Sequence, residues 1–128
     1  MNSNQLPIDE YSQFNATYIA ALENVEMFEE LEISLHGFIK FVQNIALDKF
    51  DYSYADGKWT IKEIIQHIID TERIFGYRAL RISRNDKTPL PGFEENDYVA
   101  LSYPQEVLDV KEIKVSDIVK NVNLNKND

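Results

Sequence analysis

Cysteine is absent from this sequence of 128 residues, and glycine, proline and histidine are scarce, with four, four and two residues. The lack of cysteine excludes disulfides, thiolate metal ligands and cysteine nucleophiles. No apolar run reaches the roughly 20 residues that a membrane-spanning helix needs. The first five residues show neither the charged nor the apolar part of a secretory signal. These absences predict a cytoplasmic protein that has no membrane contact.

Positive charge is also in short supply, since 13 basic residues stand against 22 acidic ones and the net charge is −9. Such a surface repels nucleic acid on average, so we expect no nucleic-acid partner. One segment, residues 73–87, departs from this balance with five basic side chains against a single acid: Arg73, Arg78, Arg81, Arg84 and Lys87 against Asp86. It is either a solvated helix face that pairs with acidic helices or a site for an anionic substrate.

The spacing of hydrophobic residues, which make up 44% of the chain, predicts an all-α fold. Apolar side chains recur every three or four residues in three segments, Ile8–Leu22, Val25–Ala46 and Ile61–Arg84. We expect Asn24 to cap the second helix. The third should start directly after Thr60, because Thr60 and Glu63 have the spacing of a capping box.

Composition changes after Tyr103. All fifteen aromatic residues lie at or before this position, whereas residues 104–128 are rich in valine, isoleucine, lysine, aspartate and asparagine. Their β-branched content predicts only a weak C-terminal helix or an extended arm. Residues 1–128 are therefore predicted to form one domain, a helical bundle with three clear helices and an incomplete C-terminal part.

His67 is the candidate metal ligand. It borders the apolar face of the third predicted helix, where a helical bundle places an inward metal ligand and where an ordinary hydrogen-bonded core histidine also lies. The other histidine, His36, points away from the apolar stripe of its own helix, and we expect it to be solvent-exposed. The chain thus supplies too few ligands for a complete histidine metal site.

Glu72 falls in the middle of the apolar face of the third predicted helix. A lone carboxylate buried there needs a partner. It either pairs with an arginine of another segment or chain, or serves as a second metal ligand or a general base. Together with Arg78 and Arg81, which share a neighbouring stripe, it is a candidate contact for an anion or a substrate.

The segment Tyr52–Asp86 resembles the DinB superfamily, and most closely its YfiT-like branch of metal-dependent hydrolases. A tryptophan, a histidine, an acid and several arginines stand in the order that this family shows. The continuation Thr88–Val99 and the N-terminal Asp9-Glu10-Tyr11 and Tyr18-Ile19 fit the same branch. The resemblance covers residues 7–102, and residues 103–128 diverge from it.

The resemblance implies a four-helix bundle, often dimeric, with a divalent metal, nickel or zinc, held by three histidines. One of these matches His67, and the other two form an H-x-x-x-H pair on the last helix. Related proteins are hydrolases or thiol S-transferases that use bacillithiol or mycothiol. No histidine follows His67 in this sequence, so only His67 carries over as a ligand. The break after Tyr103 leads us to expect a truncated or frame-shifted gene product.

Three functions follow as hypotheses. The first is a DinB-like homo-oligomer that has lost its metal and activity and serves as a binding or scaffold protein. The second is a metal-dependent hydrolase or thiol S-transferase whose site is completed across a dimer, with His67 of both subunits and a carboxylate of Glu72, Asp109 or Glu112. The third is a non-catalytic bundle that binds an anion or another small molecule through the arginines of residues 73–87.

Overall fold

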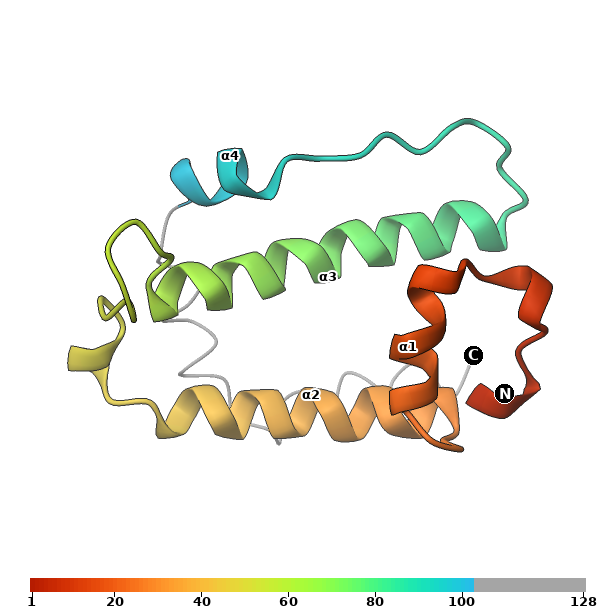
Figure 1. Ribbon diagram of the computed structural model, residues 1–128, viewed down its shortest axis with the longest axis horizontal. Helices are drawn as coiled ribbons and strands as arrows, with labels where there is room; N and C mark the ends of the chain where they lie inside the picture. The colour runs from red at the N-terminus through yellow and green to blue at the C-terminus, as the bar shows by residue number, and fades with distance from the viewer. Residues whose placement is uncertain (103–128) are drawn as a thin grey trace, which may run out of the picture. The chain divides into compact units, whose positions relative to one another are not determined.

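The computed structural model describes residues 1–102, and its regular structure is helical. The four α-helices are α1 (Gln13–Ala21), α2 (Met27–Asn44), α3 (Ile61–Ser83) and α4 (Glu95–Ala100), and no β-strand occurs in this part of the chain (Figure 1). The predicted all-α fold class is confirmed. No helix between residues 1 and 102 combines the length and the apolar character that crossing a bilayer requires. The predicted C-terminal helix or arm, with Asp109 and Glu112, lies outside the described residues.

α3 begins where its capping box predicts. The Thr60 hydroxyl accepts a hydrogen bond from the Glu63 amide at 3.3 Å, and the Glu63 carboxylate accepts one from the Thr60 amide at 2.6 Å. Two of the amides that a helix start leaves without intrahelical partners are satisfied in this way. The predicted start of the helix at Ile61 is therefore confirmed.

α3 ends in a Schellman turn. Asn85 adopts the left-handed conformation with φ of 57°. The amide of Asn85 donates to the Ile82 carbonyl at 2.9 Å, and the amide of Asp86 donates to the Arg81 carbonyl at 3.0 Å. Asparagine tolerates this conformation better than most residues, and the turn reverses the direction of the chain.

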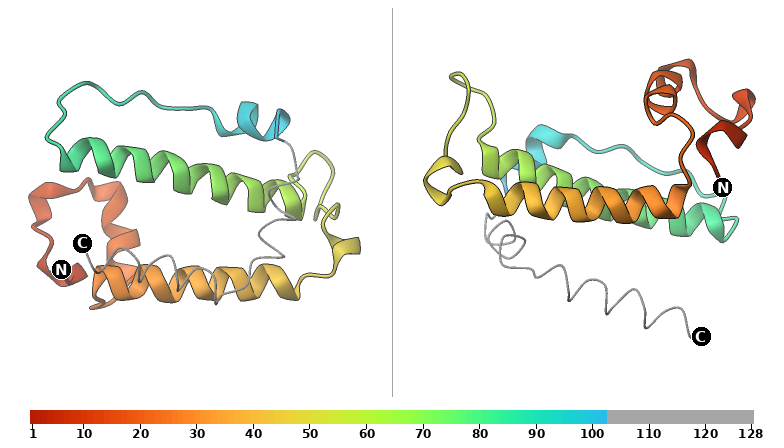
Figure 2. Two further views of the ribbon diagram at one scale, coloured as in Figure 1. Left: turned by 180° about the vertical axis from the view of Figure 1, so that it is seen from behind. Right: turned by 90° about the horizontal axis from the view of Figure 1, so that it is seen from below.

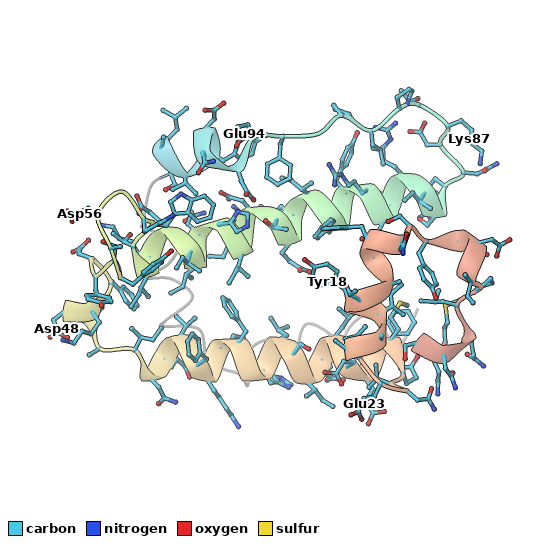
Figure 3. The ribbon with its side chains drawn as sticks, in the orientation of Figure 1. Tyr18, Glu23, Asp48, Asp56, Lys87 and Glu94 are labelled. Atoms are coloured by element: carbon cyan, nitrogen blue, oxygen red, sulfur yellow. The ribbon has the colours of Figure 1, made fainter. Side chains whose placement is uncertain are left out.

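Residues 86–94, called the return segment below, run back along α3 without regular secondary structure apart from local turns and lead into α4. All views place the return segment and α4 beside α3 (Figures 1 and 2). Lys87 lies near the start of the segment and Glu94 at its end (Figure 3). The arrangement brings residues from two stretches of sequence along one side of α3.

The chain divides into two compact units, Met1–Phe41 and a second unit that begins at Val42. In the first unit, α1 starts at Gln13 because the Ser12 hydroxyl accepts a hydrogen bond from the Asn15 amide at 3.3 Å. The preceding residues Ile8–Glu10 form a 3-10 turn. The helix predicted over residues 8–22 is thus too long at its N-terminal end.

α2 also starts later than the sequence predicts. Its first turn is capped by the Glu26 carboxylate, which accepts a hydrogen bond from the Glu29 amide at 2.9 Å. This bond holds the pKa of Glu26 below its ordinary value. Asn24 instead accepts a hydrogen bond from the Asn2 side chain, and a bridge between Asn2 and Glu26 keeps the preceding residues out of the helix. The prediction of Asn24 as the cap was wrong.

The apolar faces predicted for α2 and α3 are only partly buried. Val42 and Ile65 are almost fully buried. Phe28, Phe75 and Ile82 lie on the same predicted faces but are 70%, 57% and 69% exposed. The prediction that these faces form a core throughout was therefore wrong for these residues. Periodicity reports which face of a helix is apolar, whereas burial also needs a second surface packed against that face.

Candidate functional site

His67 lies on the second turn of α3 between an aromatic ring and a carboxylate. Its imidazole lies against the indole of Trp59, with ring centroids 5.1 Å apart and planes tilted by 51°. Its Nε2 is 3.6 Å from Oε2 of Glu95, the first residue of α4. The capping box at the start of α3 holds Trp59 one residue before the cap, and the return segment delivers Glu95. The His67 side chain retains a quarter of its solvent exposure.

Sequence reasoning missed Glu95 as the neighbour of His67. The two residues are 28 positions apart, and the helix α4 that carries Glu95 is only six residues long. Such a short helix leaves no periodicity to detect. The acidic pair Glu94-Glu95 directly after Phe93 was the available signal, and it does not indicate which residue of α3 lies opposite.

The donors around His67 do not fit a three-histidine metal centre. Throughout residues 1–102, no three histidine, aspartate or glutamate side chains come close enough together to hold a metal ion. His67 and Glu95 supply one imidazole and one carboxylate, whereas a catalytic zinc site uses three protein ligands. The other histidine, His36, belongs to the first unit and is half-buried, so the prediction that it is solvent-exposed was wrong.

Glu72 is solvent-exposed, in contrast to the buried position that its place on the apolar face predicted. Within the part of the chain that the structure describes, it forms no ion pair. The neighbouring residues Ile68 and Phe75 on that face of α3 are also solvent-exposed. The carboxylate of Glu72 therefore keeps its hydration and needs no partner. Its role as a contact for a metal or a substrate stays a prediction.

Arg81 fastens the return segment to α3. Its Nε lies 2.5 Å from Oδ2 of Asp86, its Nη2 donates to the Thr88 carbonyl at 2.9 Å, and its Nη1 donates to the Tyr77 hydroxyl at 3.3 Å. The bonds to Asp86 and Tyr77 raise the pKa of Arg81. Asp86 already balances the charge of Arg81, so this arginine positions the segment.

Asp86 is held in its ionised form by the same contacts. The amide of Thr88 donates to its Oδ1 at 2.9 Å. This bond, followed by the Thr88 hydroxyl and the Arg81 guanidinium, lowers the pKa of Asp86 from 3.8 to about 2. Arg81, Asp86 and Thr88, called the clamp below, therefore fix the beginning of the return segment.

Arg78, one turn before Arg81 on α3, is placed differently. Its Nη2 donates to the Pro91 carbonyl at 3.1 Å, and its guanidinium lies over the Phe75 ring, 5.8 Å from the centroid. Among the described residues, no carboxylate lies within ion-pair distance of Arg78. Within residues 1–102, its positive charge is thus not balanced by a neighbouring acid.

A pocket of about 310 Å³ opens between α3 and residues 90–98. Two arginines and a larger number of apolar and aromatic side chains form its walls: Arg73, Ile74, Tyr77, Arg78, Leu90, Pro91, Gly92, Phe93 and Tyr98. Of the predicted contacts, only Arg78 lines the pocket directly. Arg81 supports it through the clamp, and Glu72 is not among its walls.

Comparison with known proteins identifies one family. The model of the DinB superfamily matches residues 30–114, a range that includes the whole of α3, the return segment and α4. No curated protein and no solved structure matches the sequence significantly. The matched range thus contains both the His67–Glu95 pair and the pocket.

Proposed function

Because the chain belongs to the DinB superfamily, we propose that it uses the helical frame of that superfamily to bind a small anionic molecule without a three-histidine metal centre of its own. The pocket between α3 and residues 90–98 is the proposed binding site. The positive charge of Arg78 at this pocket, which no carboxylate among residues 1–102 pairs with, carries the proposal.

The size and the lining of the pocket support this function. Small-molecule sites occupy about 300–1,000 Å³ and combine apolar walls with a few polar groups that orient the ligand. The pocket, at about 310 Å³, lies at the lower end of that range. In a chain with a net charge of −9, an arginine that pairs with no acid in the described part of the chain is a specific attraction for an anion.

The donor set at His67 supports binding over catalysis. Hydrolases and thiol S-transferases of the superfamily depend on a metal, and here one imidazole and one carboxylate face each other. In this proposal the relation to those enzymes is one of descent. The fold is retained, and the metal-dependent reaction is lost.

A titration of metal-stripped protein tests the proposal. The full chain, kept in a chelator, is titrated with a panel of small carboxylates and phosphates, and binding is measured by calorimetry. We expect saturable binding of at least one member, with the same affinity in the His67→Ala variant. Binding that requires added nickel or zinc, or no binding by any member, would overturn the proposal.

A metal-dependent enzyme with a site completed across a dimer is the second candidate. The distance of 3.6 Å between His67 Nε2 and Glu95 Oε2 favours it, because imidazole and carboxylate are both ligands of divalent zinc or nickel and both side chains are partly exposed. Metal content after reloading with nickel and zinc decides between the candidates. Stoichiometric metal that is lost in His67→Ala but kept in His36→Ala would support the enzyme, and a metal-free protein would exclude it.

A further inference from the structure

We infer that the pocket selects a flat aromatic monoanion, a carboxylate carried on one or two fused rings, with Arg78 as its anion contact. This inference rests on the proposed function and names the class of ligand.

The walls of the pocket favour an aromatic body. Tyr77, Phe93 and Tyr98 contribute three aromatic rings, and those of Phe93 and Tyr98 lie 5.2 Å apart at an angle of 52°. Aromatic rings pack well against each other in tilted or offset arrangements with centroids about 4.5–7 Å apart. An inorganic anion would leave these apolar walls in contact with water, whereas a flat ring removes them from it.

The charges around the pocket favour a single negative charge on the ligand. Of the arginines on this side of α3, Arg81 is balanced by Asp86, and Nη1 of Arg73 lies 3.6 Å from Oδ1 of Asp70. Arg78 remains as the one pocket arginine without a carboxylate within reach in the described part of the chain. A ligand with several charges would find one unpaired arginine of the described residues at this pocket, in a chain whose net charge is −9.

The geometry of Arg78 suits a carboxylate. A guanidinium has five N–H donors, and the Pro91 carbonyl accepts from one of its nitrogens at 3.1 Å. The remaining donors can bind both oxygens of a carboxylate at once, which an ammonium group in the same place would do less well. The bond to Pro91 also turns the guanidinium toward the return segment that forms the opposite wall.

Calorimetric titration of the full chain with matched ligands tests the inference. The probes are 2-naphthoate, its neutral analogue 2-naphthamide, hexanoate and inorganic phosphate. We expect 2-naphthoate to bind about ten- to a hundredfold more tightly than 2-naphthamide, because the amide is neutral and offers the guanidinium one acceptor oxygen instead of two. Hexanoate should bind at least tenfold more weakly than 2-naphthoate, and phosphate should not saturate in the same range.

Three variants separate ligand contact from structural support. In Arg78→Gln, the preference for 2-naphthoate over 2-naphthamide should fall to less than threefold, whereas Arg84→Gln, at the C-cap of the same helix and outside the pocket walls, should keep it. Tyr98→Leu should weaken both naphthyl ligands several-fold and leave their ratio unchanged. If Arg78→Gln weakens both ligands equally and keeps the preference, Arg78 only holds the segment and the inference is wrong.

The failure of this inference differs from the failure of the proposed function. If hexanoate or phosphate binds as tightly as 2-naphthoate, the aromatic class is wrong while anion binding stands. If no carboxylate and no phosphate binds to the wild-type chain, the proposed function fails together with its ligand class.

Discussion

Asp86 shows how a single carboxylate can hold a segment that lacks regular secondary structure. Its oxygens accept hydrogen bonds from Thr88 and face Arg81, which in turn donates to the Thr88 carbonyl. The ionised form is therefore the one that fits the fold. Protonation removes the charge that Arg81 balances and weakens the contacts that Asp86 itself makes with Arg81 and Thr88.

The titration of Asp86 is predicted to be displaced to low pH. The folded chain binds this proton with a pKa of about 2 and the unfolded chain near the ordinary value of 3.8, so the unfolded state holds more protons between these values. The contribution to stability is present above pH 3.8 and is lost as the pH falls through about 2. An NMR titration of the Asp86 carboxyl carbon measures this directly.

The Arg81→Gln variant provides the control for this titration. Removing the guanidinium takes away one of the three groups that favour the ionised carboxylate, so the midpoint should move upward while the Thr88 contacts keep part of the shift. A midpoint near 3.8 in the unaltered chain would show that the clamp does not form in solution.

The side chains of Thr60 and Glu63 fix the N-terminal boundary of α3, and removing one of them should lower the free energy of unfolding measurably. Replacing Thr60 with alanine removes a cap and leaves the Glu63 amide without its acceptor. We expect the free energy of unfolding to fall by about 1 kcal/mol, a typical value for the loss of a helix cap. Urea denaturation followed by circular dichroism gives the value. Thr17→Ala, in the exposed interior of α1, should leave stability nearly unchanged or slightly higher.

Two glycines inside helices are predicted sites of stabilisation. Gly37 in α2 and Gly76 in α3 have no atom within 4 Å of the place that a Cβ would occupy. Alanine at either position should raise the free energy of unfolding by about 0.5–1 kcal/mol, because it restricts the unfolded chain and favours the helix. Gly57 is the opposing control, since its φ of 71° makes alanine unfavourable there. Thermal denaturation that shows no difference in sign between these variants would contradict the assignment.

The ends of the helices show which parts of the fold a sequence can predict. The start of α3 follows from Thr60 and Glu63 alone, because the bonds that define it join residues three positions apart. The start of α2 depends on Asn2, which bridges to Glu26, the residue directly before the helix and 24 positions further along the chain. Contacts of this kind carry no local pattern and were predicted incorrectly.

The candidate site divides in the same way. The arginines of residues 73–87 and the border position of His67 could be read from helical spacing. The roles of Arg78 and Arg81 could not be distinguished, because Asp86 and Pro91 reach them only after the chain turns at Asn85. The pocket depends on that reversal, and helical periodicity contains no information about it.

The exposed apolar surface of α3 predicts self-association of the molecule. Phe75 and Ile82, two turns apart on one face, are 57% and 69% exposed. Large apolar side chains that gather on one exposed surface commonly mark an interface. We therefore propose a homo-oligomer, and we expect light scattering after size-exclusion chromatography to give a mass above 14.9 kDa.

Introducing positive charge on that face tests the interface. The double variant Phe75→Lys and Ile82→Lys should shift the mass to that of the monomer, because lysine is costly to bury in an apolar contact. Tyr54→Lys, at an equally exposed aromatic in a loop, should leave the assembly intact. A wild-type chain that stays monomeric at millimolar concentration would rule the interface out.

The way in which α3 holds the return segment has a consequence for how ligand preference can change during evolution. Arg81 and Arg78 donate hydrogen bonds to the backbone carbonyl oxygens of Thr88 and Pro91. Every amino acid supplies such a carbonyl oxygen. The side chains of Leu90 and Phe93, which line the pocket, take no part in these two hydrogen bonds. Substitutions at positions 90 and 93 therefore leave these two hydrogen bonds in place. We expect that single substitutions there can change which ligand the pocket prefers during evolution while the return segment stays attached to α3.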